Sequence, residues 1–363
     1  MNTIPGNMSE ESDYIKGRGA QVNPHNRFHA ERRVIEDWEG VDEPDGHEGK
    51  TTFIEVFPKT IVNKVDSPDV GFDYSLNPYQ GCEHGCTYCY ARPTHEYWGY
   101  SAGIDFEKII LVKKNAPELL EAALQRKKWE VKPITISGNT DCYQPCERTY
   151  GITRQLLQLM LKYRHPVSII TKNVLLNRDL DLLEALAELN LVSVNMSITT
   201  LDEDLRRKLE PRTASAKRKL ETIEKLTQIG VPVNVMMAPI IPALNDHEIF
   251  SILKEVGSRG ALSAHYTLVR LNGPNGEIFT DWVTKNFPDR AAKVINQIKE
   301  MRGGKLNDSR FGVRMRGEGN YAINLKRQFE LARSRFLPQR AYPKLRTDLF
   351  IRTTSGQLDL FGE

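Results

Sequence analysis

The chain has 363 residues, which at about 150 residues per domain corresponds to one large domain or two ordinary ones. Its 40% apolar and 27% charged residues supply a sizeable core, which excludes wholesale disorder. No membrane span is expected, because no run of 18 apolar residues is present, and the N-terminus lacks the apolar stretch of a secretory signal. Five cysteines in so long a chain indicate reduced thiols and a cytoplasmic protein, in which clustered cysteines favour a metal site over disulfides.

Charge is unevenly distributed along the chain. Residues 1–50 carry six basic and eleven acidic side chains, whereas residues 301–363 carry thirteen basic and six acidic ones. A basic region of this kind is typical either of contact with nucleic acid or of a solvated face, and charge alone does not decide between them.

The N-terminal residues 1–51 are predicted to form an acidic, flexible segment, because they contain few aromatic residues to bury. One short helix is conceivable over residues 28–38. Regular structure is expected to begin at Thr52, where the sequence FIEVF predicts a strand that leads into a core over residues 52–271.

Strand-like and helix-like segments alternate through this core. The strands are predicted as near-continuous apolar runs buried on both faces, over residues 72–79, 133–137, 167–171, 191–199, 231–241 and 264–271. Apolar residues recur at intervals of three and four in the helical segments 117–129, 152–163, 179–190, 215–230 and 245–258. The pattern predicts a parallel α/β sheet, either a full or partial barrel with its site at the carboxyl ends of the strands, or a flat doubly wound sheet.

Residues 272–363 are predicted to form a basic, mostly helical C-terminal extension. It would contain a long amphipathic helix over 281–303, a segment rich in Gly and Arg, and a basic helix near 321–336.

The most specific motif is YQGCEHGCTYCYAR, in which Cys82, Cys86 and Cys89 follow the first strand of the core. Three thiolates at this spacing suit one corner of an iron–sulfur cube, and a [4Fe–4S] cluster held by only three of them leaves one iron open to a small molecule. A structural zinc ion is the alternative, and it would need a fourth ligand such as His84 or His95.

This motif, with Tyr88 just before the third cysteine, resembles the radical S-adenosylmethionine (SAM) superfamily, over about residues 72–271. The resemblance implies an α/β fold, a partial (β/α)6 TIM-like barrel, with a [4Fe–4S] cluster and SAM as cofactors. It also implies reductive cleavage of SAM to a 5′-deoxyadenosyl radical that abstracts hydrogen from a substrate, with an external reductant such as flavodoxin or ferredoxin.

Within the superfamily the chain is most similar to the spore photoproduct lyase-like branch. That similarity implies that Thr140 and Asp141 lie near the methionyl group of SAM, Lys172 near its carboxylate, and Ser197 near its ribose or carboxylate. Tyr88 would lie beside the adenine, with Tyr90 following in the cluster loop. The stretch containing Glu210 and Arg212 also matches, with Lys219 where the branch usually has Arg.

The chain departs from the thymine-repairing lyase where that enzyme carries a hydrogen-donor cysteine, because this chain reads Ser137–Gly138–Asn139 there. Cys142 and Cys146, with Tyr143 between them, are alternative hydrogen donors, or else small buried residues of the core. The predicted substrate is a nucleic acid or nucleotide, supported by a basic cluster over residues 206–219 and by the basic C-terminal region. Modification of a protein, peptide or small metabolite is the alternative, and an electron-transfer iron–sulfur protein is the non-enzymatic one.

Overall fold

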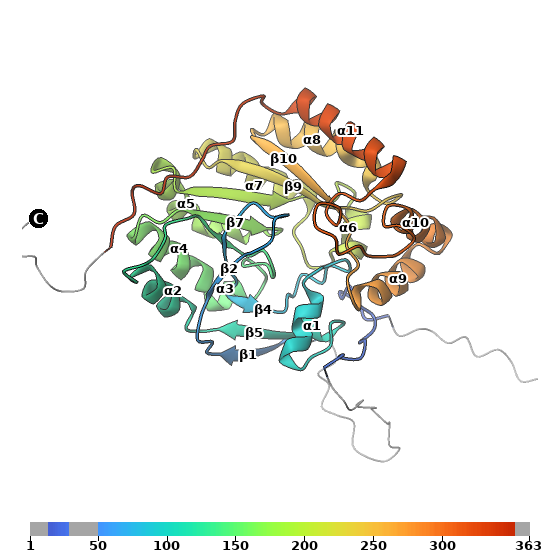
Figure 1. Cartoon of the computed structure of the whole chain (residues 1–363), viewed down its shortest axis with the longest axis horizontal. Coiled ribbons are helices and arrows are strands. Elements are labelled where there is room, and N and C mark those ends of the chain that lie inside the picture. Colours follow the sequence, from blue (N-terminus) through green and yellow to red (C-terminus); the bar gives the residue numbers. More distant parts are fainter. Residues whose placement is uncertain (1–13, 29–49, 353–363) are drawn as a thin grey trace, which may run out of the picture.

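The computed structural model describes residues 14–28 and 50–352 (Figure 1). Its main sheet has seven strands in the order β10-β9-β8-β7-β6-β3-β2. Six of them run parallel, and β2 is antiparallel to β3, so the parallel α/β prediction is confirmed. The two end strands do not pair with each other, which leaves the sheet open. The strands are β2 Val62–Lys64, β3 Tyr74–Leu76, β6 Ile134–Ile136, β7 Val167–Thr171, β8 Val192–Ser197, β9 Val233–Ile240 and β10 Ser263–Leu268.

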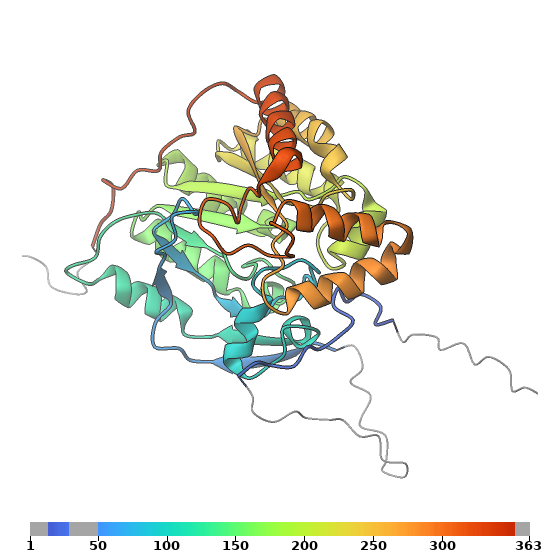
Figure 2. The same cartoon turned by 45° about the vertical axis from the view of Figure 1, so that its right-hand side comes forward.

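Helices cover one face of this sheet and bury the main hydrophobic core against it (Figures 1 and 2). They are α2 Ala116–Leu124, α4 Ile152–Lys162, α5 Leu180–Glu188, α7 Ala216–Gln228 and α8 Ile249–Ser258. Short helical segments connect them: η1 Arg92–Trp98, α1 Asp105–Lys108, α3 Glu147–Tyr150, η2 Val174–Asp179, α6 Glu203–Leu209 and η3 Asp246–Glu248. No described helix is both long and apolar enough to cross a membrane.

The opposite face of the sheet carries many polar side chains, which the prediction of near-continuous apolar runs did not anticipate, although β6 and β8 are largely buried on both faces as predicted. Along β7 to β10 the residues that meet the helices are apolar, and most of those that alternate with them on the inner face are polar. Asn195 donates to Ser168 Oγ at 2.9 Å, Asn234 donates to Asn195 at 2.8 Å, and His265 Nδ1 lies 2.8 Å from Asn234 Oδ1. A continuous hydrogen-bonded row therefore crosses four strands.

A second, three-stranded sheet contains β1 Thr52–Val56, β5 Ile109–Lys113 and β4 Tyr79–Gln80. β1 confirms the strand expected at FIEVF, whereas β5 was not predicted. The strand predicted over 72–79 is divided between the two sheets. Pro78 lies at the division, because proline has no N–H with which to continue the ladder of β3.

The C-terminal region has two helices where one long helix was predicted. α9 Asn275–Asn286 ends at Phe287, whose φ of −143° is not helical, and α10 Pro288–Glu300 begins at the next residue. A residue before proline disfavours the helical region, and proline suits the first position of a helix, so the break follows from Pro288. The basic helix expected near 321–336 is present as α11 Gly319–Phe336, which packs on α8.

Part of the N-terminal segment that was expected to be poorly ordered packs against the core. Arg18, Ala20 and Asn26 are each at most 7% exposed. The rest of that segment, including nearly all of the helix expected over 28–38, lies outside the described residues.

Candidate active site

The predicted site residues gather at one edge of the main sheet, beyond the carboxyl ends of neighbouring parallel strands. The cysteine loop follows β3 and β4, Asp141 follows β6, Lys172 follows β7, and Ser197 ends β8. Parallel strands bring their carboxyl ends to a common edge, which is where α/β folds of this kind bind ligands.

A buried guanidinium fixes the shape of the cysteine loop. Arg92 is 0% exposed, and its Nε and one terminal nitrogen donate to the carbonyl oxygen of Cys86 at 3.0 and 2.8 Å. The same group pairs with the carboxylate of Glu107. The side chain of Asn275, the first residue of α9, donates to the carbonyl oxygen of Cys89 at 2.9 Å. The C-terminal extension therefore holds the loop directly.

The N-terminal residues also brace this loop. The Glu107 carboxylate accepts hydrogen bonds from the main-chain N–H groups of Gly19 and Ala20, at 3.0 and 2.8 Å. A Cβ atom on Gly19 would overlap the carbonyl oxygen of Gly85, so this close approach requires glycine.

The donor set fits an iron–sulfur cluster. Cys82 and Cys86 are buried and Cys89 is partly buried, and burial raises the pKa of all three thiols. The neighbouring Asp141, Cys86 and Cys89 raise the pKa of Cys82 further. Iron binds thiolates, so a bound cluster would favour the ionised form of these side chains. The three thiols of a cube bind different iron atoms, so they need not converge on a point as ligands of a single zinc ion must.

His84, which was considered as a fourth zinc ligand, is directed elsewhere. Its Nδ1 lies 3.4 Å from an oxygen of Asp141, and its Nε2 lies 3.1 Å from the side-chain nitrogen of Asn173. Burial lowers the pKa of His84. His95 is buried, and neither of its ring nitrogens has a hydrogen-bond partner in the described structure.

Asp141 connects the loops that follow β6 and β7 through hydrogen bonds. Its carboxylate accepts a hydrogen bond from Thr171 Oγ1 at 2.8 Å and one from the main-chain N–H of Lys172 at 2.7 Å. It also accepts from the main-chain N–H of Tyr143 at 2.9 Å. The hydroxyl of Thr140 donates a hydrogen bond to the carbonyl oxygen of Tyr79 at 2.6 Å. Asp141 and Thr140 therefore hold the main chain around the site in place.

A buried group of charges surrounds Lys172. The carboxylate of Glu210 lies 3.2 Å from Lys172 Nζ and 3.3 Å from Lys219 Nζ, and Tyr88 and Thr199 donate hydrogen bonds to it. Burial opposes ionisation of Glu210, but the two lysines prevail and lower the pKa of its carboxyl. Burial likewise opposes the charge on Lys172, yet Glu210 raises the pKa of its amine. Thr199 was not singled out in the sequence, because a threonine after a strand carries no distinctive signal.

Two further predicted SAM-binding residues differ in exposure. Ser197 is 5% exposed at the end of β8, on the same inner face as Asn195. Tyr90 is 48% exposed, and its hydroxyl donates to the carbonyl oxygen of Gly138. The structure therefore brings Tyr88, Lys172 and Asp141 together, with Tyr90 at the rim.

The three candidate hydrogen donors lie in the hydrophobic core instead. Cys142 and Tyr143 are 0% exposed and Cys146 is 4% exposed, and all three belong to the main core cluster. The hydroxyl of Tyr143 donates to Asp179 Oδ2 at 3.0 Å. This placement favours the alternative in which they are buried core residues.

We expect iodoacetamide to leave Cys142 and Cys146 unmodified in the native protein and to label both after denaturation. Burial raises the pKa of both thiols, so almost no thiolate is present to react at neutral pH. Peptide mass spectrometry of native and denatured samples measures the labelling. Rapid labelling of either thiol in the native protein would show instead that it is open to a substrate cavity, as a hydrogen donor must be.

Comparison with known proteins identifies a family and several relatives. The profile of the radical SAM superfamily matches residues 76–256. An uncharacterised protein of Mycobacterium tuberculosis is 33% identical over 253 residues, which are 69% of this chain and 73% of that protein. An uncharacterised protein of Methanocaldococcus jannaschii is 27% identical over 248 residues, which are 68% of this chain and 88% of that protein.

Solved structures show the same fold. A mutant of spore photoproduct lyase superimposes with a TM-score of 0.58 at 17% identity, over 79% of this chain and 80% of that chain. Spore photoproduct lyase complexed with dinucleoside spore photoproduct gives a TM-score of 0.57 at 15% identity, with the same coverage. These likenesses confirm the predicted partial (β/α)6 barrel.

Proposed function

The chain belongs to the radical SAM superfamily, and on this premise we propose that Cys82, Cys86 and Cys89 bind a [4Fe–4S] cluster with SAM beside it. When bound, these cofactors supply reductive cleavage of SAM to methionine and a 5′-deoxyadenosyl radical that abstracts hydrogen from a substrate. The observation that carries the proposal is the position of three neighbouring thiols, two buried and one partly buried, at the same edge of the sheet as Lys172.

Each residue of the site has a separate part in this proposal. Lys172 supplies a fixed positive charge for the carboxylate of SAM, because Glu210 keeps the amine protonated and Asp141 holds its main chain. Ser197 offers a hydroxyl to the ribose or carboxylate, and the ring of Tyr88 lies beside the adenine. Arg92 holds the cysteine loop in place through the Cys86 carbonyl oxygen.

For the substrate we propose a nucleic acid or nucleotide. Support comes from the likeness of the fold to spore photoproduct lyase, which has been solved with a dinucleoside bound, and from the basic C-terminal region. The basic cluster over 206–219 lends less support than its composition suggested, because Arg206 pairs with Glu203 and Lys219 with Glu210. Ser137–Gly138–Asn139 replaces the donor cysteine of the lyase, so the product radical would be quenched by another route.

Anaerobic reconstitution followed by addition of SAM and dithionite tests the chemistry. We expect chromatography to detect 5′-deoxyadenosine from the reconstituted protein and none from the unreconstituted chain. An intact cluster without any 5′-deoxyadenosine would contradict the proposal and favour an electron-transfer protein. In the cell, flavodoxin or ferredoxin would supply the electron.

Replacing Lys172 with Ala should weaken SAM binding about ten- to a hundredfold while the cluster is retained, since a charge-assisted hydrogen bond is worth about 1.5–3 kcal/mol. Anaerobic calorimetric titration of the reconstituted protein with SAM measures the affinity. Lys162→Ala is the matched control, because Lys162 pairs with Glu121 on the surface and lies on α4, outside the site. Equal SAM affinity in the two variants would remove Lys172 from the SAM site.

A further inference from the structure

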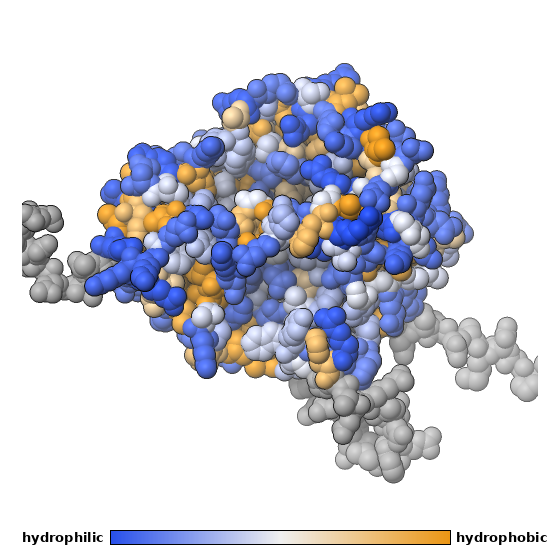
Figure 3. Space-filling model, viewed as in Figure 1, coloured by the Kyte–Doolittle hydropathy of each residue, from blue (hydrophilic) through white to orange (hydrophobic). Residues whose placement is uncertain are grey.

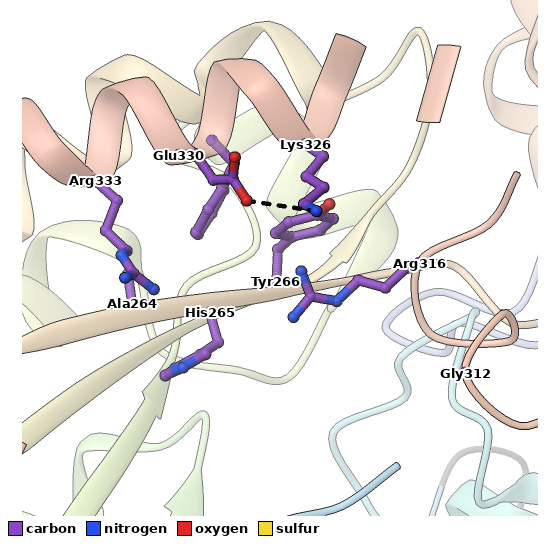
Figure 4. Close-up of a pocket in the computed structure, with 9 residues that line it drawn as sticks. Ala264, His265, Tyr266, Gly312, Arg316, Lys326, Glu330 and Arg333 are labelled. Carbon is purple, nitrogen blue, oxygen red and sulfur yellow. Dashed lines mark ion pairs between the residues drawn. The ribbon is translucent and has the colours of Figure 1, made fainter. Parts of the chain in front are cut away.

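A pocket of about 520 Å³ lies at the edge of the main sheet that is formed by β10, between this strand and α11 (Figure 4). β10 is the last strand of the sheet, and the pocket runs along its free edge. Figure 4 shows that the side chains of α11 reach down toward β10 while Arg316 enters from the preceding loop. Its polar lining consists of His265, Tyr266, Arg316, Lys326, Glu330 and Arg333.

Two of the arginines in this pocket keep an unpaired positive charge. Among the described residues, neither Arg316 nor Arg333 forms an ion pair, whereas Lys326 Nζ lies 3.7 Å from Glu330. The pocket therefore has a net positive lining. Two other arginines of the loop before α11 are paired, Arg314 with Asp69 and Arg310 with Asp308 and Glu318.

The pocket also contains a buried hydroxyl group, that of Tyr266, which is poorly hydrogen-bonded. Tyr266 is 3% exposed, and its hydroxyl has no hydrogen-bond partner of good geometry in the described structure. The ring packs on Phe329, with centroids 4.6 Å apart, and the guanidinium of Arg316 lies 4.9 Å from its centroid. Burial raises the pKa of this hydroxyl, and its contact with the Arg316 side chain opposes that rise. A poorly hydrogen-bonded buried hydroxyl costs free energy, so a ligand that reaches it would gain a better hydrogen bond.

We propose that this pocket binds a phosphate group of the substrate. The inference rests on the proposed function and adds to it a second contact point, remote from the cysteine loop. Guanidinium groups donate paired hydrogen bonds that match phosphate oxygens, and the Tyr266 hydroxyl adds a neutral donor. Glu330 is neutralised by Lys326, so it does not cancel the attraction from Arg316 and Arg333.

The position of the pocket fits a substrate that enters the barrel from its open side. His265 lines the pocket and also ends the polar row that continues through Asn234 and Asn195 to Ser168. A phosphate bound at the pocket would place the adjoining nucleoside on this polar inner face. Figure 3 shows the face of the molecule seen in Figure 1, on which hydrophilic side chains alternate with apolar areas.

Fluorescence anisotropy of a labelled single-stranded oligonucleotide of about twelve nucleotides, added to the reconstituted full chain, tests the site. The variant Arg316→Ala with Arg333→Ala should bind at least about tenfold more weakly than wild type. The slope of log affinity against log salt should fall by about 0.7 for each phosphate that the variant no longer neutralises. The matched control is Arg327→Ala with Arg335→Ala, which removes the same charge from exposed positions of α11 that do not line the pocket.

Weaker oligonucleotide binding in the pocket variant alone supports the phosphate site. Equal weakening in both variants would mean diffuse attraction to α11. Unchanged binding in the pocket variant would mean that the pocket binds no phosphate. Competition by adenosine monophosphate would assign the pocket to a nucleotide, and competition only by unlabelled oligonucleotide would assign it to a polynucleotide. Formation of 5′-deoxyadenosine by the wild type is measured separately, so failure of the radical chemistry is distinguishable from failure of this pocket.

Discussion

Replacing Cys86 with Ala should lower the iron content of the reconstituted chain from about four atoms per chain to background. The cube has only three protein thiolates, so loss of one leaves two iron atoms without a protein ligand. The loop itself should survive the change, because Arg92 binds the main-chain oxygen of residue 86, which alanine retains. Iron and sulfide analysis with visible absorption spectroscopy measures the loss.

Cys142→Ala is the matched control for this experiment, since it removes a buried thiol that lies outside the loop. This variant should load a full cluster, with stability somewhat lowered by the vacated space in the core. A full cluster in Cys86→Ala would overturn the ligand assignment. Loss of the cluster in both variants would instead show that the measurement reports folding and not ligation.

The sequence predicts most about features that are local in the chain. The three cysteines lie within eight residues, so their spacing alone indicates a shared metal cluster. β7 is a short run rich in β-branched residues, and that composition was enough to place it.

Features that depend on distant residues were predicted poorly. The pairing of Arg314 with Asp69 joins residues 245 positions apart, and no local pattern indicates it. The polar row across β7 to β10 had a local signal, a polar residue at every second position, but the apolar character of the runs concealed it. The break at Pro288 had a signal as well, since proline at that position ends the preceding helix.

Replacing Glu210 with Gln should lower the free energy of unfolding by about 3–5 kcal/mol, because it leaves Lys172 and Lys219 without their shared buried counter-charge. The amide oxygen can still accept hydrogen bonds from Tyr88 and Thr199, so the change removes mainly the charge. Urea unfolding followed by circular dichroism measures the difference. Glu255→Gln is the matched control, since the surface pair of Glu255 on α8 with Arg259, the residue that follows the helix, is worth at most about 0.5 kcal/mol.

The pH dependence of stability and a second substitution distinguish the loss of the Glu210 charge from a packing defect. The folded-state pKa of Glu210 lies below its ordinary value of 4.5, so its contribution is present above that pH and is lost as the pH falls further. The difference in stability between wild type and Glu210→Gln should therefore shrink between about pH 5 and pH 3. Adding Lys219→Met to Glu210→Gln should restore part of the lost stability, because it removes the fully buried one of the two unpaired cations. A pH-independent loss without any rescue would show that Glu210 acts through packing and not through its charge.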